Sequence, residues 1–541
     1  MELTNANKIP VAQTGCQVSR DNTVIVESFK SVSWTPLLVI LLAGFFYVAT
    51  VRSGHEWGDD FSLYIIHAKN IASGQDYRQG GYLHYSPYLG PDAYPPIFPL
   101  LLAPVYLFFG LNLTALKMVV IAGFLASLLV FLLIVKSELT VAWQAVLLAA
   151  VSFNPYIWDQ KDRLTSDLVF LVFAYLAIVL VNNVYRPKAD AMNWKRALII
   201  SSVFYLSYGT RSLGLLLVPC LLLYDMIRRK KLIPSRFAIG ISGTTLILIA
   251  LQSHFLHSDR GYYDQFATSF HDSLSTWLKY IAHNVVAYVI SLTDVWDNGY
   301  SRIFRLGLTV VITGLAGLGY LSRLWREITY TEIFVTLYVL VVLIVPMDGG
   351  LRYLIPAIPF YIFYAQQGLY ALPINPASRN AAAAVLGAAI LISYFAKYSQ
   401  QDLKQLQNGI SKVESVEFFD YIKQRTPASD VFIFTKPRAL ALFTERKSSF
   451  YPMDLDDKGL WDYFLKIHAT HIVVGPKGIS PEEQAFLRRF VDKYSASLQL
   501  EFSNDDFNAY HIMQIPNANG RTKYNRMRLT DPRPQGEPDS K

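Results

Sequence analysis

The stretch Trp57-Gly58-Asp59-Asp60-Phe61 places two adjacent aspartates just after the first strongly apolar segment of the chain. That segment, 34–51, is close to the roughly 20 apolar residues that a helix needs to cross a bilayer. Carboxylates are costly to desolvate, so a pair at a membrane edge sits in water or in a polar cavity. We therefore expect the other spans and loops to build and cover a polar site above this pair.

The composition is that of a membrane protein. Of the 541 residues, 52% are hydrophobic and 17% are charged, and the charges cluster between apolar runs. The formal net charge is +8, but Lys and Arg fall mostly in short loops beside the spans, where the positive-inside rule explains them better than a nucleic-acid partner. Cys16 lies in a polar tail and Cys220 in a span, which excludes a disulfide framework.

About 11 apolar segments are predicted to cross the membrane. They are 34–51, 115–135, 141–157, 167–185, 197–208, 210–227 (turning at Gly209), 237–256, 303–321, 331–346, 353–372 and 380–397. With a cytoplasmic N-terminus, the basic clusters in 186–196, 228–236 and 323–326 all face the cytoplasm. The proline-broken stretch 95–110 is interpreted as a helix lying at the interface, because a further span there would move those clusters outside.

The predicted fold class is a polytopic α-helical membrane protein with a small extracytoplasmic α/β domain at its C-terminus. Residues 1–33 form a cytoplasmic tail, and 34–397 form a transmembrane domain in the plasma (inner) membrane, with a large first extracytoplasmic loop at 52–114. Helical and strand patterns alternate over 398–516, which predicts the α/β domain. Residues 517–541, rich in Asn, Arg, Pro and Asp, are predicted to be disordered.

Local patterns predict the elements outside the spans. In the first loop, apolar residues recur at helical spacing over 61–73, and Gly74 follows as a stop signal. In the C-terminal domain, helices are predicted at 411–425, 460–467 and 481–494, and strands at 431–435, 471–475, 498–502 and 509–515. The outside connection 257–302 is predicted to be a loop.

Asp59 and Asp60 are the first candidates for chemistry. On a structural interpretation they are a solvated pair that ends a span. On a functional interpretation they supply a general base or a metal ligand. A carboxylate can accept a proton from an attacking hydroxyl, and a like-charged neighbour raises its pKa toward the useful range.

A second acidic group lies in the sequence WDQKDRLTSD, residues 158–167. Its charged residues are Asp159, Lys161, Asp162, Arg163 and Asp167. The predicted topology puts this loop on the same membrane face as Asp59, so the two loops can share one site. Mixed carboxylates and cations suit a phosphate-bearing substrate, with or without a divalent metal. The alternative is an ordinary polar loop.

Two arginines lie in predicted outside turns, Arg211 in YGTRSLG and Arg352 in DGGLRYLIP. Each can snorkel or pair locally. Alternatively they clamp a donor phosphate, with Arg163 as a third candidate, because a planar guanidinium binds phosphate oxygens bidentately. Fixed cations would then stabilise a leaving group in place of a general acid.

Other catalytic motifs are absent from the sequence, among them GxxxxGK[ST], HExxH and GxSxG. His254, His257 and His271 are interpreted as surface histidines. Asp294 and Asp297 form a weaker third acidic candidate.

Four stretches together resemble the GT-C glycosyltransferases, most closely the dolichyl-phosphate-mannose protein mannosyltransferases and the lipid A aminoarabinose transferases. They are GDDFSLYIIHAKNIASGQDY (58–77), YPPIFPLLLAPVYLFFG (94–110), NPYIWDQKDRLTSDLVFLVF (154–173) and LRYLIPAIPFYIFYAQQGL (351–369). They resemble the family's acidic first loop, interface helix, second acidic loop and RY-P-P span, and they occur in the family's order.

The resemblance implies a membrane enzyme that moves a sugar from a polyprenyl-phosphate donor to a hydroxyl of a glycan, lipid or protein, with inversion, on the extracytoplasmic side. The family's first-loop acid maps to Asp59, with Asp60 as the adjacent alternative, and its second-loop acid maps to Asp167 rather than Asp162. Asp59 and Asp167 are the ligands if a divalent metal is bound. This chain has Asp-Asp where the family often has Asp-Glu. The resemblance therefore does not decide which carboxylate acts as the base or whether a metal is bound.

Two other classes of function remain as alternatives. A transporter or flippase of a lipid-linked or anionic substrate also carries ionisable residues among its spans, although usually near the bilayer midplane. A non-catalytic scaffold would present the outer domain to a partner and would be insensitive to changes at Asp59 and Asp60.

Overall fold

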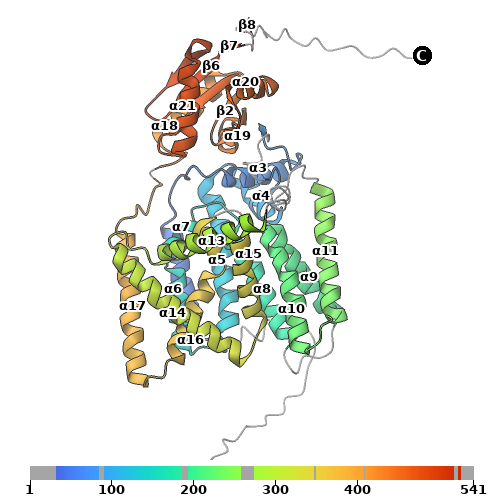
Figure 1. Ribbon diagram of the computed structural model, residues 1–541, viewed down its shortest axis with the longest axis vertical. Coiled ribbons are helices and arrows are strands. Elements are labelled where there is room, and N and C mark those ends of the chain that lie inside the picture. Colours follow the sequence, from blue (N-terminus) through green and yellow to red (C-terminus); the bar gives the residue numbers. More distant parts are fainter. Residues whose placement is uncertain are drawn as a thin grey trace, which may run out of the picture.

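The chain folds into a helical bundle with a mixed α/β domain seated on one end of it (Figure 1). The computed structural model describes residues 32–83, 91–185, 193–256, 273–345, 349–406, 408–516 and 522–524. The architecture is that of a multi-span membrane protein with a C-terminal α/β domain.

Each predicted span overlaps at least one helix. The helices of the bundle are α2 (Trp34–Ala49), α3 (Asp60–Ser73), α4 (Ile97–Phe109), α5 (Leu113–Val135), α6 (Val141–Ser152), α7 (Pro155–Gln160), α8 (Asp167–Val184), α9 (Trp194–Thr210), α10 (Leu217–Arg229), α11 (Arg236–Leu256), α13 (Leu274–Leu292), α14 (Arg302–Arg326), α15 (Tyr330–Ile344), α16 (Ile358–Ala371) and α17 (Pro376–Tyr398). Among the described residues, α5, α8, α11, α14 and α17 are long and apolar enough to cross a membrane, whereas α2, α6 and α15 are shorter apolar helices. The number of spans therefore stays a prediction.

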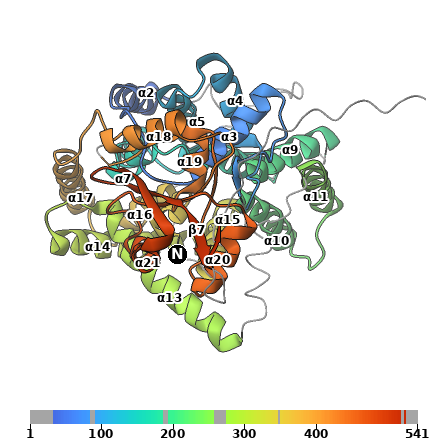
Figure 2. The ribbon, with the colours of Figure 1, turned by 90° about the horizontal axis from the view of Figure 1, so that it is seen from above.

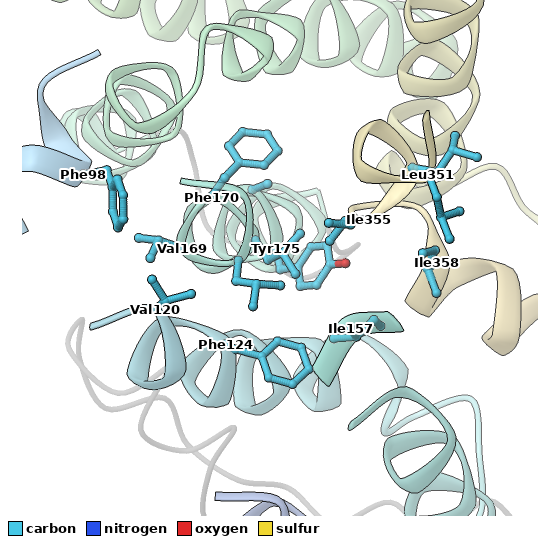
Figure 3. Packing of buried hydrophobic residues seen from close by; sticks show 14 of the residues in the cluster. Phe98, Val120, Phe124, Ile157, Val169, Phe170, Tyr175, Leu351, Ile355 and Ile358 are labelled. Carbon is cyan, nitrogen blue, oxygen red and sulfur yellow. The ribbon is translucent and has the colours of Figure 1, made fainter. Parts of the chain in front are cut away.

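The centre of the bundle is built around α8, which packs against α5 and α9. Val120 of α5 lies beside Val169 of α8 in the buried cluster of Figure 3, and Phe124 lies one turn further along α5. Gly123 allows this close approach, because a Cβ there would lie 2.7 Å from a methyl carbon of Val169.

Three span predictions need correction where a local signal interrupts the helix. The segment 141–157 is divided, because Pro155 cannot donate to the preceding turn and the Asn154 side chain caps a new helix, α7. The turn expected at Gly209 lies further on, in the 3-10 helix η2 (Ser212–Leu216). The segment 353–372 begins as the 3-10 helix η4 (Gly350–Leu354), with α16 starting only after Pro356.

The outside connection 257–302 also differs from the prediction, because it contains the 19-residue helix α13. Asn284 of α13 donates to the carbonyls of Leu343 and Val345 at the end of α15, and α13 also packs against η4. Seen from above, α13 runs along one side of the bundle (Figure 2). It thus flanks the η4 turn that carries Arg352.

The helix predicted in the first loop is confirmed as α3, and Gly74 ends it in the left-handed region at φ 65°. The stretch 95–110 forms α4, which starts after Pro96 and packs against α3.

The C-terminal domain is a six-stranded mixed sheet with strand order β1-β3-β2-β4-β6-β5. Its strands are β1 (Tyr82–Leu83), β2 (Val431–Ile433), β3 (Lys447–Ser449), β4 (His471–Val474), β5 (Leu498–Ser503) and β6 (Asn508–Ile512), and its helices are α18 (Val413–Arg425), α19 (Pro437–Thr444), α20 (Asp457–Lys466) and α21 (Pro481–Lys493). The predicted helices and strands are present, whereas α19, β3 and β1 were not predicted. Strand β1 belongs to the first loop and pairs with β3, so the loop and the outer domain share one sheet.

Three predictions fall at or beyond the edge of the described residues, namely those on the C-terminal tail, the N-terminal tail and two histidines. Residues 522–524, inside the tail predicted to be disordered, form strand β8 and pair with β7 (Gln514–Pro516). The rest of 517–541, residues 1–31, His257 and His271 lie outside the described residues.

Candidate active site

Asp60 is the first residue of α3 and holds two strong hydrogen bonds. The Tyr94 hydroxyl donates to Oδ1 at 2.6 Å, and Arg352 donates from Nη1 to Oδ2 at 2.8 Å. Burial by itself raises the pKa of Asp60, but the charge of Arg352 and these hydrogen bonds outweigh it and lower the pKa to about 2. The side chain remains 39% exposed, so Asp60 is an ionised carboxylate within reach of an incoming molecule.

Asp167, the first residue of α8, links two arginines to this carboxylate. Arg352 donates from Nε to Asp167 Oδ2 at 2.7 Å, and Arg211 pairs with Asp167 Oδ1. The result is a row of alternating charges, Asp60–Arg352–Asp167–Arg211, which we call the charge row. Its members come from α3, η4, α8 and the end of α9, and the middle carboxylate, Asp167, is only 1% exposed.

Asp59 has hydrogen-bond partners that differ from those of Asp60. Its Oδ1 accepts from the backbone N–H of Ala439 at 3.3 Å, and its Oδ2 lies 3.8 Å from Nε of Arg438. Burial, partly offset by the charges of Arg438 and Lys436, raises the pKa of Asp59. Asp60 also lies near Arg438, with 3.8 Å between its Oδ1 and Nη1 of the arginine. The two carboxylates differ in their hydrogen bonds, because Asp59 accepts from the outer domain whereas Asp60 accepts from Tyr94 and Arg352.

Sequence reasoning missed two residues of the site, namely Tyr94 and, on α19, Arg438. Arg438 is 1% exposed and donates from Nη1 to the Tyr94 hydroxyl at 2.9 Å and from Nη2 to the Pro91 carbonyl at 3.0 Å. The Tyr94 hydroxyl in turn donates a hydrogen bond to Asp60, and Nη1 of Arg438 lies 3.8 Å from Asp60 Oδ1. The outer domain is therefore connected to the charge row through this phenol and through Arg438 itself. The only sequence signal for Arg438 was Pro437, a helix-starting residue before a short apolar run.

Asp162 and Arg163 are in the second acidic loop but outside the charge row. Asp162 accepts from Arg52 Nε at 2.6 Å and from Lys161 Nζ at 2.6 Å, and lies 3.6 Å from Lys117 Nζ. All four side chains are at most 4% exposed. This cluster ties the end of α2 to α5 and α7, so its position indicates a structural role.

Arg163 is half-exposed and pairs with Glu56 at 3.1 Å and with Asp159 at 3.1 Å. Arg163 therefore forms its ion pairs with Glu56 and Asp159, outside the charge row. Asp294 and Asp297 pair with Arg305, and Asp297 also pairs with Lys397, so this third acidic pair has cations of its own. His254 lies on α11, near its end.

The acids nominated as metal ligands, Asp59 and Asp167, have separate partners. Asp59 faces Arg438 and the Ala439 amide, whereas both oxygens of Asp167 are engaged by arginines. The guanidinium of Arg352 lies between Asp60 and Asp167 and pairs with both. A divalent ion shared by these two carboxylates would have to occupy the same position and be surrounded by oxygen ligands, whereas a cation is already there. Asp59, Asp60 and Asp167 therefore do not fit a shared divalent ion.

The comparisons bear on the fold of this helical membrane bundle and the mixed α/β domain at one end of it. No family model and no curated protein sequence matches the chain.

Two solved structures illustrate the likeness. ArnT from Cupriavidus metallidurans, bound to undecaprenyl phosphate, is similar with a TM-score of 0.53 and 12% identity, over 88% of this chain and 97% of ArnT. The oligosaccharyltransferase AglB from Archaeoglobus fulgidus, in complex with an inhibitory peptide and a dolichol-phosphate, has a TM-score of 0.56 and 11% identity, over 93% of this chain and 75% of AglB. At these identities the likeness establishes the GT-C fold.

Proposed function

We propose that this protein transfers a sugar from a polyprenyl-phosphate donor to an acceptor hydroxyl on the extracytoplasmic face of the membrane, with inversion. The observation that carries the proposal is the charge row, which presents a partly exposed carboxylate and two arginines side by side on a GT-C scaffold. The polyprenyl phosphates bound to ArnT and AglB are ligands of the same chemical class.

Arg352 and Arg211 suit the donor phosphate because their fixed positive charges can lie beside the oxygen on which negative charge develops as the sugar–phosphate bond breaks. A sugar–phosphate–lipid diester carries one negative charge, and the lipid phosphate that leaves carries up to two. Cations held beside the breaking bond therefore stabilise the transition state more than the bound donor. Asp167 holds both arginines in place before the donor arrives.

Asp60 is the better candidate for the acceptor side. In the proposed step, the acceptor oxygen attacks the anomeric carbon from the face opposite the phosphate and the sugar–phosphate bond breaks. Its electron pair leaves with the lipid phosphate, and the hydroxyl proton passes to Asp60. When the phosphate draws Arg352 toward itself, Asp60 loses part of its counter-charge and its pKa rises. Donor binding thus makes the base stronger at the moment it is needed.

Arg438 and Tyr94 are positioning residues in this scheme. Tyr94 donates to the oxygen of Asp60 that does not contact Arg352, which orients the carboxylate. Arg438 holds the phenol from the outer domain. The outer domain then has to be docked for the site to be complete.

Binding of undecaprenyl phosphate is the direct test. We expect the purified protein in nanodiscs to bind it, with the affinity reduced at least about tenfold in Arg352→Gln and Arg211→Gln, which each remove one charge-assisted contact. Arg305→Gln is the matched control, because Arg305 is a similarly exposed arginine that pairs with other aspartates. Equal binding by all four proteins would overturn the assignment of the phosphate site.

Sugar transfer is tested on membranes supplied with polyprenyl-phosphate sugars and followed by release of the lipid phosphate. Loss of transfer in Asp60→Asn, with normal membrane expression, supports the proposal. Movement of the intact donor across proteoliposomes without any release of lipid phosphate would identify a flippase instead.

A further inference from the structure

Two histidines and a glutamate converge on the C-terminal sheet. His471 of β4 is the register partner of His511 of β6, and Glu501 lies on β5 at the irregularity between Leu500 and Phe502. One ligand atom from each of the three side chains lies within 4.8 Å of the other two. Within the described part of the chain, no other set of His, Cys, Asp and Glu residues meets this criterion.

The hydrogen bonds around His471 determine which ring nitrogen is free to bind an ion. The Thr470 hydroxyl donates its single proton to the Val431 carbonyl at 3.1 Å, and its oxygen accepts the Val431 N–H at 3.0 Å. Nδ1 of His471 lies 2.9 Å from that same oxygen and 3.7 Å from Oδ2 of Asp430, and two acceptor oxygens beside Nδ1 favour the tautomer with its proton there. In the neutral ring the proton is thus on Nδ1, and Nε2 carries a lone pair.

That lone pair points at a carboxylate. Nε2 of His471 lies 3.3 Å from Oε2 of Glu501, a contact in which both atoms are acceptors when the ring is neutral. Such a contact is stable only with a cation or a proton between the two atoms. In a tetrahedral zinc site, nitrogen and oxygen ligands at about 2.1 Å from the ion are separated by about 3.4 Å.

The surroundings have the supporting shell that metal sites require. The Asp430 carboxylate lies 3.7 Å from Nδ1 of His471, and Tyr421 donates to Oε2 of Glu501 at 3.1 Å. A carboxylate or a hydroxyl on the far ring nitrogen orients a ligating imidazole and increases its basicity. His471 is 2% exposed, whereas Glu501 is 32% exposed, so an ion can enter from the Glu501 side.

We propose that His471, Glu501 and His511 form a binding site for a divalent transition-metal ion, with zinc the best match to a two-histidine, one-carboxylate ligand set. The ion would join β4, β5 and β6 at one point, and a water molecule would complete the tetrahedron. The site shares no residue with the charge row and does not depend on the proposed sugar transfer.

Cobalt binding tests the proposal in the full-length protein. The purified protein is treated with a chelator and titrated with Co²⁺, and the visible absorption of tetrahedral cobalt is recorded. We expect about one ion per chain, displacement by Zn²⁺, and a higher temperature of unfolding with the metal bound. Glu501→Gln and His511→Gln should each lower the affinity at least about tenfold.

The control is His283→Gln, which removes an exposed histidine from α13 and should leave the titration unchanged. Glu501→Gln keeps the shape of a partly exposed side chain, so its folding can be checked by the unfolding temperature without metal. If the folded variants bind Co²⁺ as the wild type does, or if the wild type shows no tetrahedral spectrum, the contact is a protonated His471–Glu501 ion pair and the proposal is wrong.

Discussion

Arg352 Nη1 lies 2.8 Å from Oδ2 of Asp60, although the two residues are 292 positions apart in the chain. The same guanidinium contacts Asp167 through Nε at 2.7 Å. One side chain thus joins both acidic loops, and it occupies the place where a bridging cation would otherwise be needed. Because each residue of the site has its own contacts, single substitutions are expected to have distinct effects.

Asp60→Asn should reduce sugar transfer more than Asp59→Asn. Asparagine cannot accept the hydroxyl proton, and general-base catalysis contributes about 10²–10⁴-fold. Asp59 faces the outer domain, so its loss should cost much less. The measurement is the initial rate of lipid-phosphate release at saturating donor, normalised to protein in the membrane. Full activity of Asp60→Asn would remove this residue from the mechanism.

Arg352→Gln should lower kcat by about 10²–10³-fold, the usual cost of removing one preorganised transition-state contact. Arg352→Lys keeps the charge but loses the two-sided fork that spans Asp60 and Asp167, so its activity should be intermediate. Steady-state kinetics of both variants, beside Arg305→Gln, measure this. If Arg352→Gln alters only KM, the arginine binds the donor without stabilising the leaving group.

Arg438→Gln should reduce kcat by about 10–100-fold, because hydrogen bonds to charged groups contribute about 1.5–3 kcal/mol. A purely structural role would leave the pH profile unchanged. Losing the positive charge of Arg438 and its hydrogen bond to Tyr94 should instead raise the pKa of Asp60. The acidic limb of the pH profile of kcat should then move to higher pH. Arg425→Gln, on the exposed side of α18, is the control. A parallel loss of activity at every pH would indicate an undocked domain only.

Asp162→Asn should destabilise the fold rather than change the chemistry. It leaves Arg52, Lys117 and Lys161 buried without their shared anion, and breaking a buried pair costs about 3–5 kcal/mol. We expect a lower Tm and poor expression, with near-normal kcat in the molecules that fold. Adding Lys161→Met should restore part of the lost stability. A stable but inactive Asp162→Asn protein would show that this acid acts in catalysis after all.

The stability supplied by Asp60 should depend on pH in a defined direction. Its folded-state pKa of about 2 is below the ordinary aspartate value of about 3.9, so ionised Asp60 favours the folded state. That contribution is fully present above about pH 4 and is lost as the pH falls toward 2. The Tm difference between the wild type and Asp60→Asn should therefore be constant from about pH 5 to 8 and vanish in acid.

Asp59→Asn should behave in the opposite way. Burial raises the pKa of Asp59, so its ionisation at neutral pH opposes folding, and the asparagine variant should be at least as stable as the wild type there. That advantage should fade as the pH falls and Asp59 becomes protonated. A Tm of Asp59→Asn well below that of the wild type at pH 7 would contradict the raised pKa.

Much of the architecture follows from the sequence because its determinants are local. Apolar runs of bilayer length specify helices, Gly74 ends α3, and alternation of patterns after residue 398 indicates an α/β domain. The common position of the two acidic loops also followed from counting helices. The division of 141–157 was one of three span predictions that needed correction, since it depends on Asn154 and Pro155 acting together within an apolar run.

What the sequence determined by itself was therefore the order of the helices and the nomination of Asp59, Asp60, Asp167, Arg211 and Arg352. Only the tertiary structure decided which of these meet. Asp162 and Asp167 are five positions apart, yet one is neutralised by Arg52 and its neighbours and the other joins the charge row. Arg438 and the histidine cluster became visible only with the sheet assembled. Ion pairing depends on distances of a few ångströms between segments far apart in sequence, and no local pattern encodes them.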